Sequence, residues 1–161
     1  MLRGHVAPEV GAVYTRAQEL CGQLGETPQL LPVLAGLQLF YHVRGEFQLA
    51  RELGEQLLDL AQRLHDPVLI VGANRMLGDT LFWVGELPSA RAHFECTIAL
   101  YNSHRQRAVL SIYGYDEGVF GHLYAALLAW LMGYPEQALK RAEEALNLAR
   151  ELAHPSASLQ L

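Results

Sequence analysis

The chain has 161 residues, of which 51% are hydrophobic and 18% charged, and it carries a net charge of −5. This length suffices for one domain with a buried core. The low charged fraction indicates a surface that another structure covers, although a well-packed helical protein would also explain part of it. Acidic and basic residues are dispersed without a basic stripe, which argues against nucleic-acid binding.

The sequence contains neither a membrane segment nor a disulfide framework. Its most apolar run, residues 119–132, is shorter than the about 20 residues that span a bilayer, and no signal-peptide pattern opens the chain. Cys21 and Cys96 lie far apart within helical patterns, so we interpret them as buried free thiols of a reducing compartment. We therefore expect a cytoplasmic protein.

Apolar residues at helical spacing predict seven helices. Their approximate ranges are 8–24, 29–44, 47–64, 67–84, 87–101, 117–132 and 135–153. Glycine or proline separates most neighbours, while the longest break, 102–116, is polar at its start and aromatic further on. We expect one all-α domain over residues 1–161.

One stretch of the sequence occurs twice. Gly45–Pro67 and Gly133–Pro155 are identical at eight of 23 positions, and a weaker copy starts at Gly85. In all three copies an alanine follows the glycine by five positions, and a small residue there lets two helices approach closely. These alanines are Ala50, Ala90 and Ala138. The repetition predicts antiparallel helix pairs stacked on one another.

The helix pairs resemble tetratricopeptide repeats, most closely in residues 76–94. There Leu77-Gly78, Gly85, Ala90 and Phe94 fall at the spacings of that family. The other copies depart from the pattern, because Leu37-Gln38 and Ala125-Ala126 replace the Leu-Gly pair. The resemblance implies a right-handed superhelix of antiparallel helix pairs.

Three longer strings, within residues 16–46, 77–95 and 132–155, are similar to the C-terminal repeats of large bacterial signalling proteins. In those proteins a cyclase-like or kinase-like domain and a predicted ATPase precede the repeats. Related repeats follow the ATPase of maltose-activator-like transcription regulators. The first resemblance implies that the chain is part of a longer multidomain protein, in which it is a protein–protein interaction scaffold that regulates a neighbouring ATPase or cyclase. The second leaves open the sensing of a small ligand or peptide in a concave groove.

The sequence contains no motif for catalysis or metal binding. It lacks a glycine-rich loop ending in Gly-Lys-Ser/Thr, a His-Glu-x-x-His motif and paired Cys-x-x-Cys motifs. Its seven histidines are scattered. We therefore expect a non-enzymatic protein with no cofactor and no metal.

The concave groove provides the main candidate binding residues. In stacked helix pairs, extended concave surfaces serve for binding, and we expect the first helix of each pair to line this surface. The candidates are His42, Arg75, Asp79, Phe82, Trp83 and Trp130, together with Leu39, Leu123 and Leu127. Arg75 and Asp79 are spaced to pair with each other. Alternatively, Arg75 anchors a ligand carboxylate beside Trp83.

Two further surfaces are candidates. Tyr113, Tyr115 and Asp116 form a patch in the long connection, since such loops are often functional; alternatively, the tyrosines pack the loop against adjacent helices. Only six residues follow Pro155, so Leu139 and Leu146 are expected to be exposed or covered by another copy. The expected partners are proteins or neighbouring domains of the parent chain, with self-association through the C-terminal helix as a further alternative. Neither nucleic acid nor membrane is expected as a partner.

Overall fold

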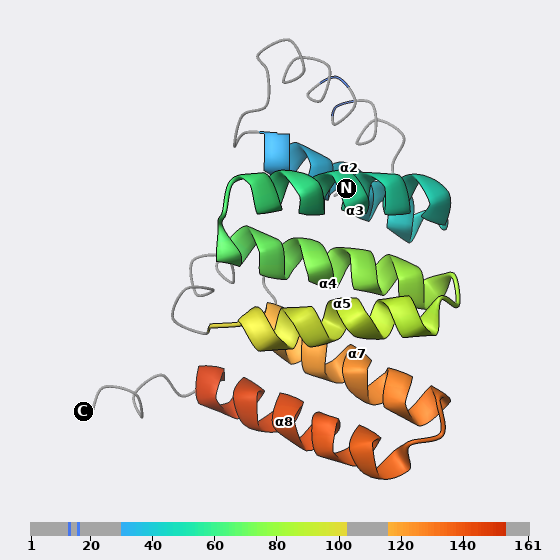
Figure 1. The fold of residues 1–161 in the computed structure, drawn as a ribbon, viewed down its shortest axis with the longest axis vertical. Coiled ribbons are helices and arrows are strands. Elements are labelled where there is room, and N and C mark those ends of the chain that lie inside the picture. The colour runs from blue at the N-terminus through green and yellow to red at the C-terminus, as the bar shows by residue number, and fades with distance from the viewer. Residues whose placement is uncertain (1–12, 14–15, 17–29, 103–115, 154–161) are drawn as a thin grey trace, which may run out of the picture.

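The computed structural model describes residues 13, 16, 30–102 and 116–153. The six helices within these residues are α2 (Leu30–Val43), α3 (Phe47–Arg63), α4 (Pro67–Trp83), α5 (Leu87–Leu100), α7 (Glu117–Leu131) and α8 (Pro135–Ala153) (Figure 1). No strand occurs among the described residues, so the all-α prediction is confirmed for this part of the chain. Of the seven helices predicted, the one over residues 8–24 lies almost wholly outside it.

The helices form a stack of antiparallel pairs. Helix α2 packs against α3, α4 against α5, and α7 against α8 (Figure 1). Adjacent pairs meet through α3 and α4 and through α5 and α7, and α4 also contacts both α2 and α7. The first helices of the pairs therefore form one layer, which we call the inner layer, and α3, α5 and α8 form the outer layer.

The three pairs share one turn. The first helix ends two residues before a glycine with positive φ, and these glycines are Gly45 (77°), Gly85 (84°) and Gly133 (84°). At the middle turn the N–H of Glu86 donates to the carbonyl of Leu81 (3.0 Å), and the N–H of Gly85 donates to that of Phe82 (3.1 Å). The same two bonds recur at the other turns. This Schellman pattern satisfies the final carbonyls of each first helix.

An aspartate caps the N-terminus of α4 and another caps that of α7. Asp66 Oδ1 accepts hydrogen bonds from the N–H groups of the second and third residues of α4, Val68 (2.9 Å) and Leu69 (3.4 Å). Asp116 Oδ1 does the same for α7, at 2.9 and 3.0 Å. Removing such a cap costs about 1 kcal/mol, so both residues help to fix where a new pair starts.

Small residues allow the paired helices to approach closely, as the repeat predicts. Ala50 and Ala90 are completely buried and Ala138 is 7% exposed. In the middle pair, a Cβ on Gly78 would lie only 3.2 Å from side-chain atoms of His93 and Phe94. Phe94 is itself fully buried, in the cluster that joins α4, α5 and α7.

One prediction about the core is wrong. Cys96, interpreted above as buried, is a free thiol on the exposed side of α5, and Cys21 lies outside the described residues. No helix in the described ranges combines the length and apolarity needed to cross a bilayer.

Candidate functional site

A connected group of polar side chains runs through the inner layer from α2 to α4. Gln38 Nε2 donates to Thr80 Oγ1 (2.8 Å) and to the carbonyl of Met76 (3.2 Å). His42 Nδ1 lies 3.3 Å from the same hydroxyl, and its Nε2 lies 3.5 Å from Asp79 Oδ2. Two side chains of α2 are thereby fixed against one turn of α4.

The group continues from α4 to α7 through a buried ion pair. Arg75 Nε donates to Glu117 Oε2, and the two residues are only 6% and 5% exposed. The Arg75 guanidinium also lies 6.0 Å from the centre of the Phe120 ring, within the range of a cation–π contact. Arg75 therefore ties α4 to α7.

Asp79 joins the two halves of this polar network. Its Oδ1 accepts a hydrogen bond from Trp83 Nε1 (3.2 Å), and its Oδ2 lies 3.9 Å from Arg75 Nη1. The pairing of Arg75 with Asp79 predicted from their spacing is present, but Glu117 is the closer partner of Arg75. Arg75 is buried and paired, and this geometry favours a structural role over the anchoring of a ligand carboxylate.

Burial shifts the pKa of several groups in this network. Burial lowers the pKa of the His42 imidazole. The Asp79 carboxylate raises this pKa and thus opposes the effect of burial, while Arg75 lowers it further. Burial raises the pKa of the Glu117 carboxyl, and the adjacent Arg75 opposes that rise. The pKa of Tyr124 rises to about 12 through burial and through its hydrogen bond and charge interaction with Asp79. Each shift reflects the cost of placing a charge away from water.

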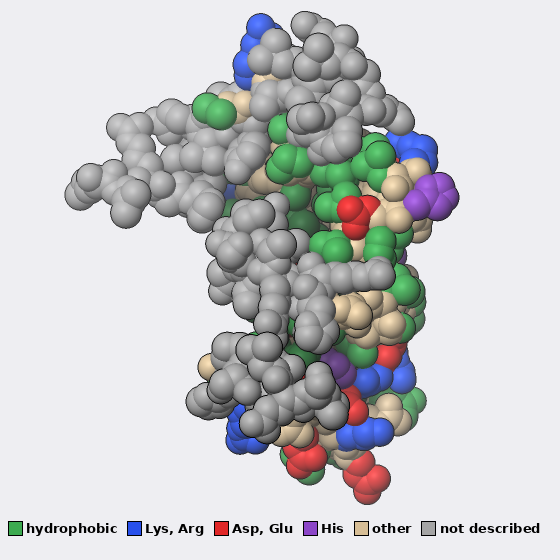
Figure 2. Space-filling model, turned by 90° about the vertical axis from the view of Figure 1, so that its left-hand side faces the viewer, with side chains coloured by type: hydrophobic (Ala, Val, Ile, Leu, Met, Phe, Trp, Pro, Cys, Tyr) green, Lys and Arg blue, Asp and Glu red, His purple; other side chains and the backbone are tan. Residues whose placement is uncertain are grey.

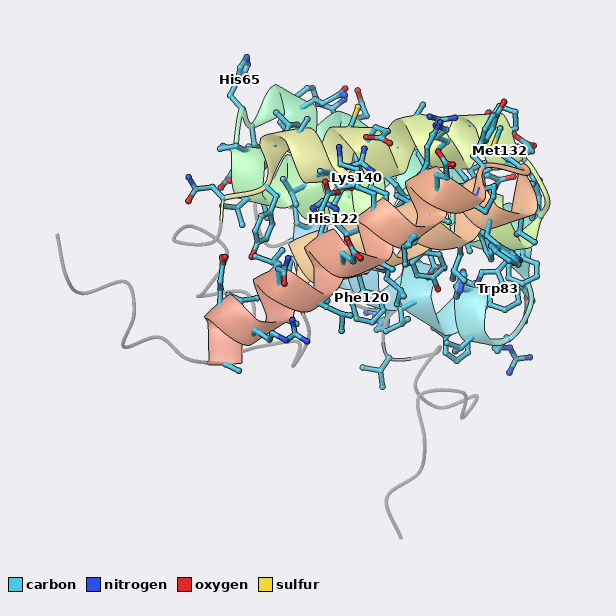
Figure 3. All side chains as sticks on the ribbon, turned by 90° about the horizontal axis from the view of Figure 1, so that it is seen from below. His65, Trp83, Phe120, His122, Met132 and Lys140 are labelled. Atoms are coloured by element: carbon cyan, nitrogen blue, oxygen red, sulfur yellow. The ribbon has the colours of Figure 1, made fainter. Side chains whose placement is uncertain are left out.

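Exposed apolar side chains lie beside this network. Trp83 on α4 is 57% exposed, and on α7 Leu123, Leu127 and Trp130 are 43%, 44% and 67% exposed. Their spacing places the three α7 residues on the same helical face as Phe120. Because Phe120 contacts Arg75 of α4, this face of α7 lies next to α4. In Figure 3, Trp83 and Phe120 lie on the same side of the molecule. Leu39 of α2 is also exposed, at 36%.

The six main candidate residues of the predicted groove thus divide into three sets. His42, Arg75 and Asp79 come together in the polar network. The ring of Phe82 lies 5.3 Å from that of Tyr124, and Tyr124 stacks on the buried Phe94, so Phe82 belongs to the aromatic packing beneath the surface.

Trp83 and Trp130 are the two main candidate residues whose side chains are exposed to solvent. They are also the only two tryptophans of the chain. We call Leu39, Trp83, Leu123, Leu127 and Trp130 together the inner apolar face.

The second candidate patch is described only at Asp116. Tyr113 and Tyr115 lie outside the described residues. Asp116 is 7% exposed, caps α7 through one oxygen and accepts a 2.6 Å hydrogen bond from the Tyr101 hydroxyl through the other. Both of its oxygens are therefore engaged in joining the end of α5 to the start of α7.

The α8 end of the stack differs from the inner apolar face. Figure 2 shows side chains of both charges gathered there. Leu139 and Leu146 are 64% and 56% exposed within the single chain, which is compatible with both alternatives expected for them. Exposure alone does not assign a partner to this helix.

The described residues contain no group of three His, Cys, Asp or Glu side chains placed to hold a metal ion. No protein-family model matches the chain, and no curated protein matches it significantly.

Proposed function

We propose that the chain is a non-catalytic protein–protein interaction module that binds a partner segment through the inner apolar face. In this proposal residues 1–161 form one tetratricopeptide-type superhelical domain. The domain acts as a cytoplasmic regulatory scaffold within a bacterial multidomain signalling ATPase or cyclase. The observation that carries the binding role is the exposure of both tryptophans, Trp83 and Trp130, on the same layer of helices.

The size of this exposed surface supports the proposal. A tryptophan side chain buries about 200 Å² when fully covered, so exposures of 57% and 67% leave roughly 250 Å² of the two rings in water. Covering that area is worth about 6 kcal/mol at about 25 cal/mol per Å². Tryptophan is also enriched among the residues that dominate binding energy at protein interfaces.

The polar network supports a binding role in a different way. Its polar groups already have partners within the chain, since Arg75 pairs with Glu117 and Asp79 accepts a hydrogen bond from Trp83. These bonds restrain the helices of the inner layer and orient the Trp83 ring. A surface fixed before binding loses less conformational entropy when a partner arrives.

One observation favours a second candidate function, the sensing of a small ligand in the same groove. The side chains of His42 and Asp79 are not completely covered, at 12% and 16% exposed, and they lie beside the exposed ring of Trp83. A few polar groups set in an apolar surface are typical of small-molecule sites.

Selection from a random-peptide phage library tests the interaction module. The chain is the bait, and each enriched peptide is screened against the double variant Trp83→Ala/Trp130→Ala. Leu139→Ala/Leu146→Ala is the matched control, because it removes two exposed apolar side chains from α8 instead.

We expect apolar peptides that bind the wild type and the control but lose affinity for the tryptophan variant. If every enriched peptide bound the folded tryptophan variant as well as the wild type, the proposal would be wrong. A thermal shift with small molecules and no enriched peptide would favour the second candidate.

A further inference from the structure

A cavity separate from the inner apolar face lies between α5, α7 and α8. Its volume is about 260 Å³, and it is open to solvent. It is lined by Arg91 and Glu95 of α5, Ala125 and Ala129 of α7, and Gln137, Lys140 and Arg141 of α8. Figure 3 shows Lys140 on the side of α8 that faces α5.

One of its three cations is already paired. Arg141 Nη2 donates to Glu95 Oε2 (2.6 Å), and its Nη1 donates to Glu144 Oε2 (3.1 Å). These two bonds hold α8 against α5 and fix the guanidinium at the wall of the cavity. Arg141 and Glu95 largely cancel each other's charge.

The other two cations face the cavity without such partners. Neither Arg91 nor Lys140 forms an ion pair within 4.0 Å with any residue that the structure describes. With the two carboxylates that pair with Arg141, Glu95 and Glu144, the three cations leave a local net charge of +1 (3 − 2). The whole chain has a net charge of −5, so this cavity is a local positive site on an acidic protein.

We propose that this cavity binds the phosphate group of a small phosphate monoester. Such a group carries a charge of about −1.5 to −2 at neutral pH, opposite in sign to Arg91 and Lys140, the two lining cations without an ion-pair partner among the described residues. Arg91 offers a planar set of donors, Lys140 a compact ammonium group and Gln137 an amide N–H, all suited to phosphate oxygens. The methyl groups of Ala125 and Ala129 provide an apolar surface for the organic part of the ligand.

The size of the cavity limits the ligand to a small molecule. Its volume of about 260 Å³ lies below the roughly 300–1,000 Å³ of pockets for drug-sized ligands. The site does not rest on the proposed interaction function, because its residues do not include any member of the inner apolar face. The two proposals therefore fail independently.

Isothermal titration of the whole chain with glycerol phosphate tests this site. The variant Arg91→Ala/Lys140→Ala removes the two cations that have no ion-pair partner among the described residues. Arg44→Ala/Arg63→Ala is the matched control, because it removes two positive charges from the α2–α3 pair, outside the cavity. Circular dichroism verifies that both variants fold.

We expect the first variant to weaken glycerol phosphate binding at least about tenfold, as for the loss of a charge-assisted hydrogen bond, and the control to change it less than about twofold. Trp83→Ala/Trp130→Ala leaves it unchanged. Three outcomes would overturn the proposal: no binding by the wild type, equal weakening in both arginine variants, or equal binding of glycerol or succinate.

Discussion

Replacing Glu117 with glutamine tests whether the Arg75–Glu117 pair holds the inner layer together. Both residues are at least 94% buried, so Glu117→Gln removes the closer of the two carboxylates that pair with Arg75 while the arginine charge stays away from water. Breaking a buried pair in this way costs about 3–5 kcal/mol. We expect about 3 kcal/mol, because the amide oxygen still accepts a hydrogen bond from Arg75. In a chain of 161 residues this corresponds to a fall in Tm of about 6–12 °C.

The assay is urea unfolding followed by far-ultraviolet circular dichroism. Glu55→Gln is the matched control, because Glu55 Oε1 lies 3.0 Å from Arg51 Nε while its side chain is 55% exposed. It is expected to cost less than about 0.5 kcal/mol. The double variant Arg75→Met/Glu117→Leu removes both charges and should recover at least about half of the loss. A Glu117→Gln variant as stable as Glu55→Gln would refute this account of the pair.

Gly118→Ala should lower the free energy of unfolding, measured in urea, by about 1–3 kcal/mol, because the new Cβ would lie 2.8 Å from the ring of Tyr101. Gly72→Ala is the control and should be neutral or stabilising, because the nearest atom to its Cβ would be 3.6 Å away. Lowering the pH from about 7.5 to about 5.5 should lower the urea midpoint, since burial lowers the pKa of three histidines and the unfolded chain then binds more protons. These are His42, His93 and His122. The raised pKa of Glu117 opposes this trend, because its contribution is present at low pH and lost as the pH rises through the folded pKa. A midpoint that rises on acidification would contradict the histidine assignment. If α8 mediates self-association, Leu139→Glu/Leu146→Glu should lower the sedimentation coefficient to that of a monomer, and identical sedimentation of both proteins would argue against it.

The helices and turns could be predicted from the sequence because their signals are local. Periodic apolar residues define each buried face, and the glycine at each pair's turn supplies the positive φ that the Schellman turn requires. The alanine after each glycine marks the close approach within a pair. Asp116 also has a local signal, because aspartate just before an apolar helical pattern is a typical N-cap, whereas the predicted loop patch assigns it to a binding surface.

The interior of the candidate site could not be predicted, because it depends on the rotation of one helix against another. The spacing in the sequence predicts Asp79, one helical turn away, as the partner of Arg75. In the structure the closer partner is Glu117, which lies in another helix pair, 42 positions along the chain. Likewise, the cavity between α5 and α8 depends on the contact of Arg141 with Glu95 across 46 positions. No spacing rule connects such residues.

Tryptophan emission tests the central claim most directly, because both tryptophans of the chain belong to the inner apolar face. The measurement is the emission spectrum, and its quenching by acrylamide, with and without a saturating amount of a phage-selected peptide that contains no tryptophan. The account predicts a shift of the emission to shorter wavelength and weaker quenching, since the bound peptide removes the two rings from water. Unchanged emission and unchanged quenching at saturation would contradict it, because the peptide would then bind elsewhere on the molecule.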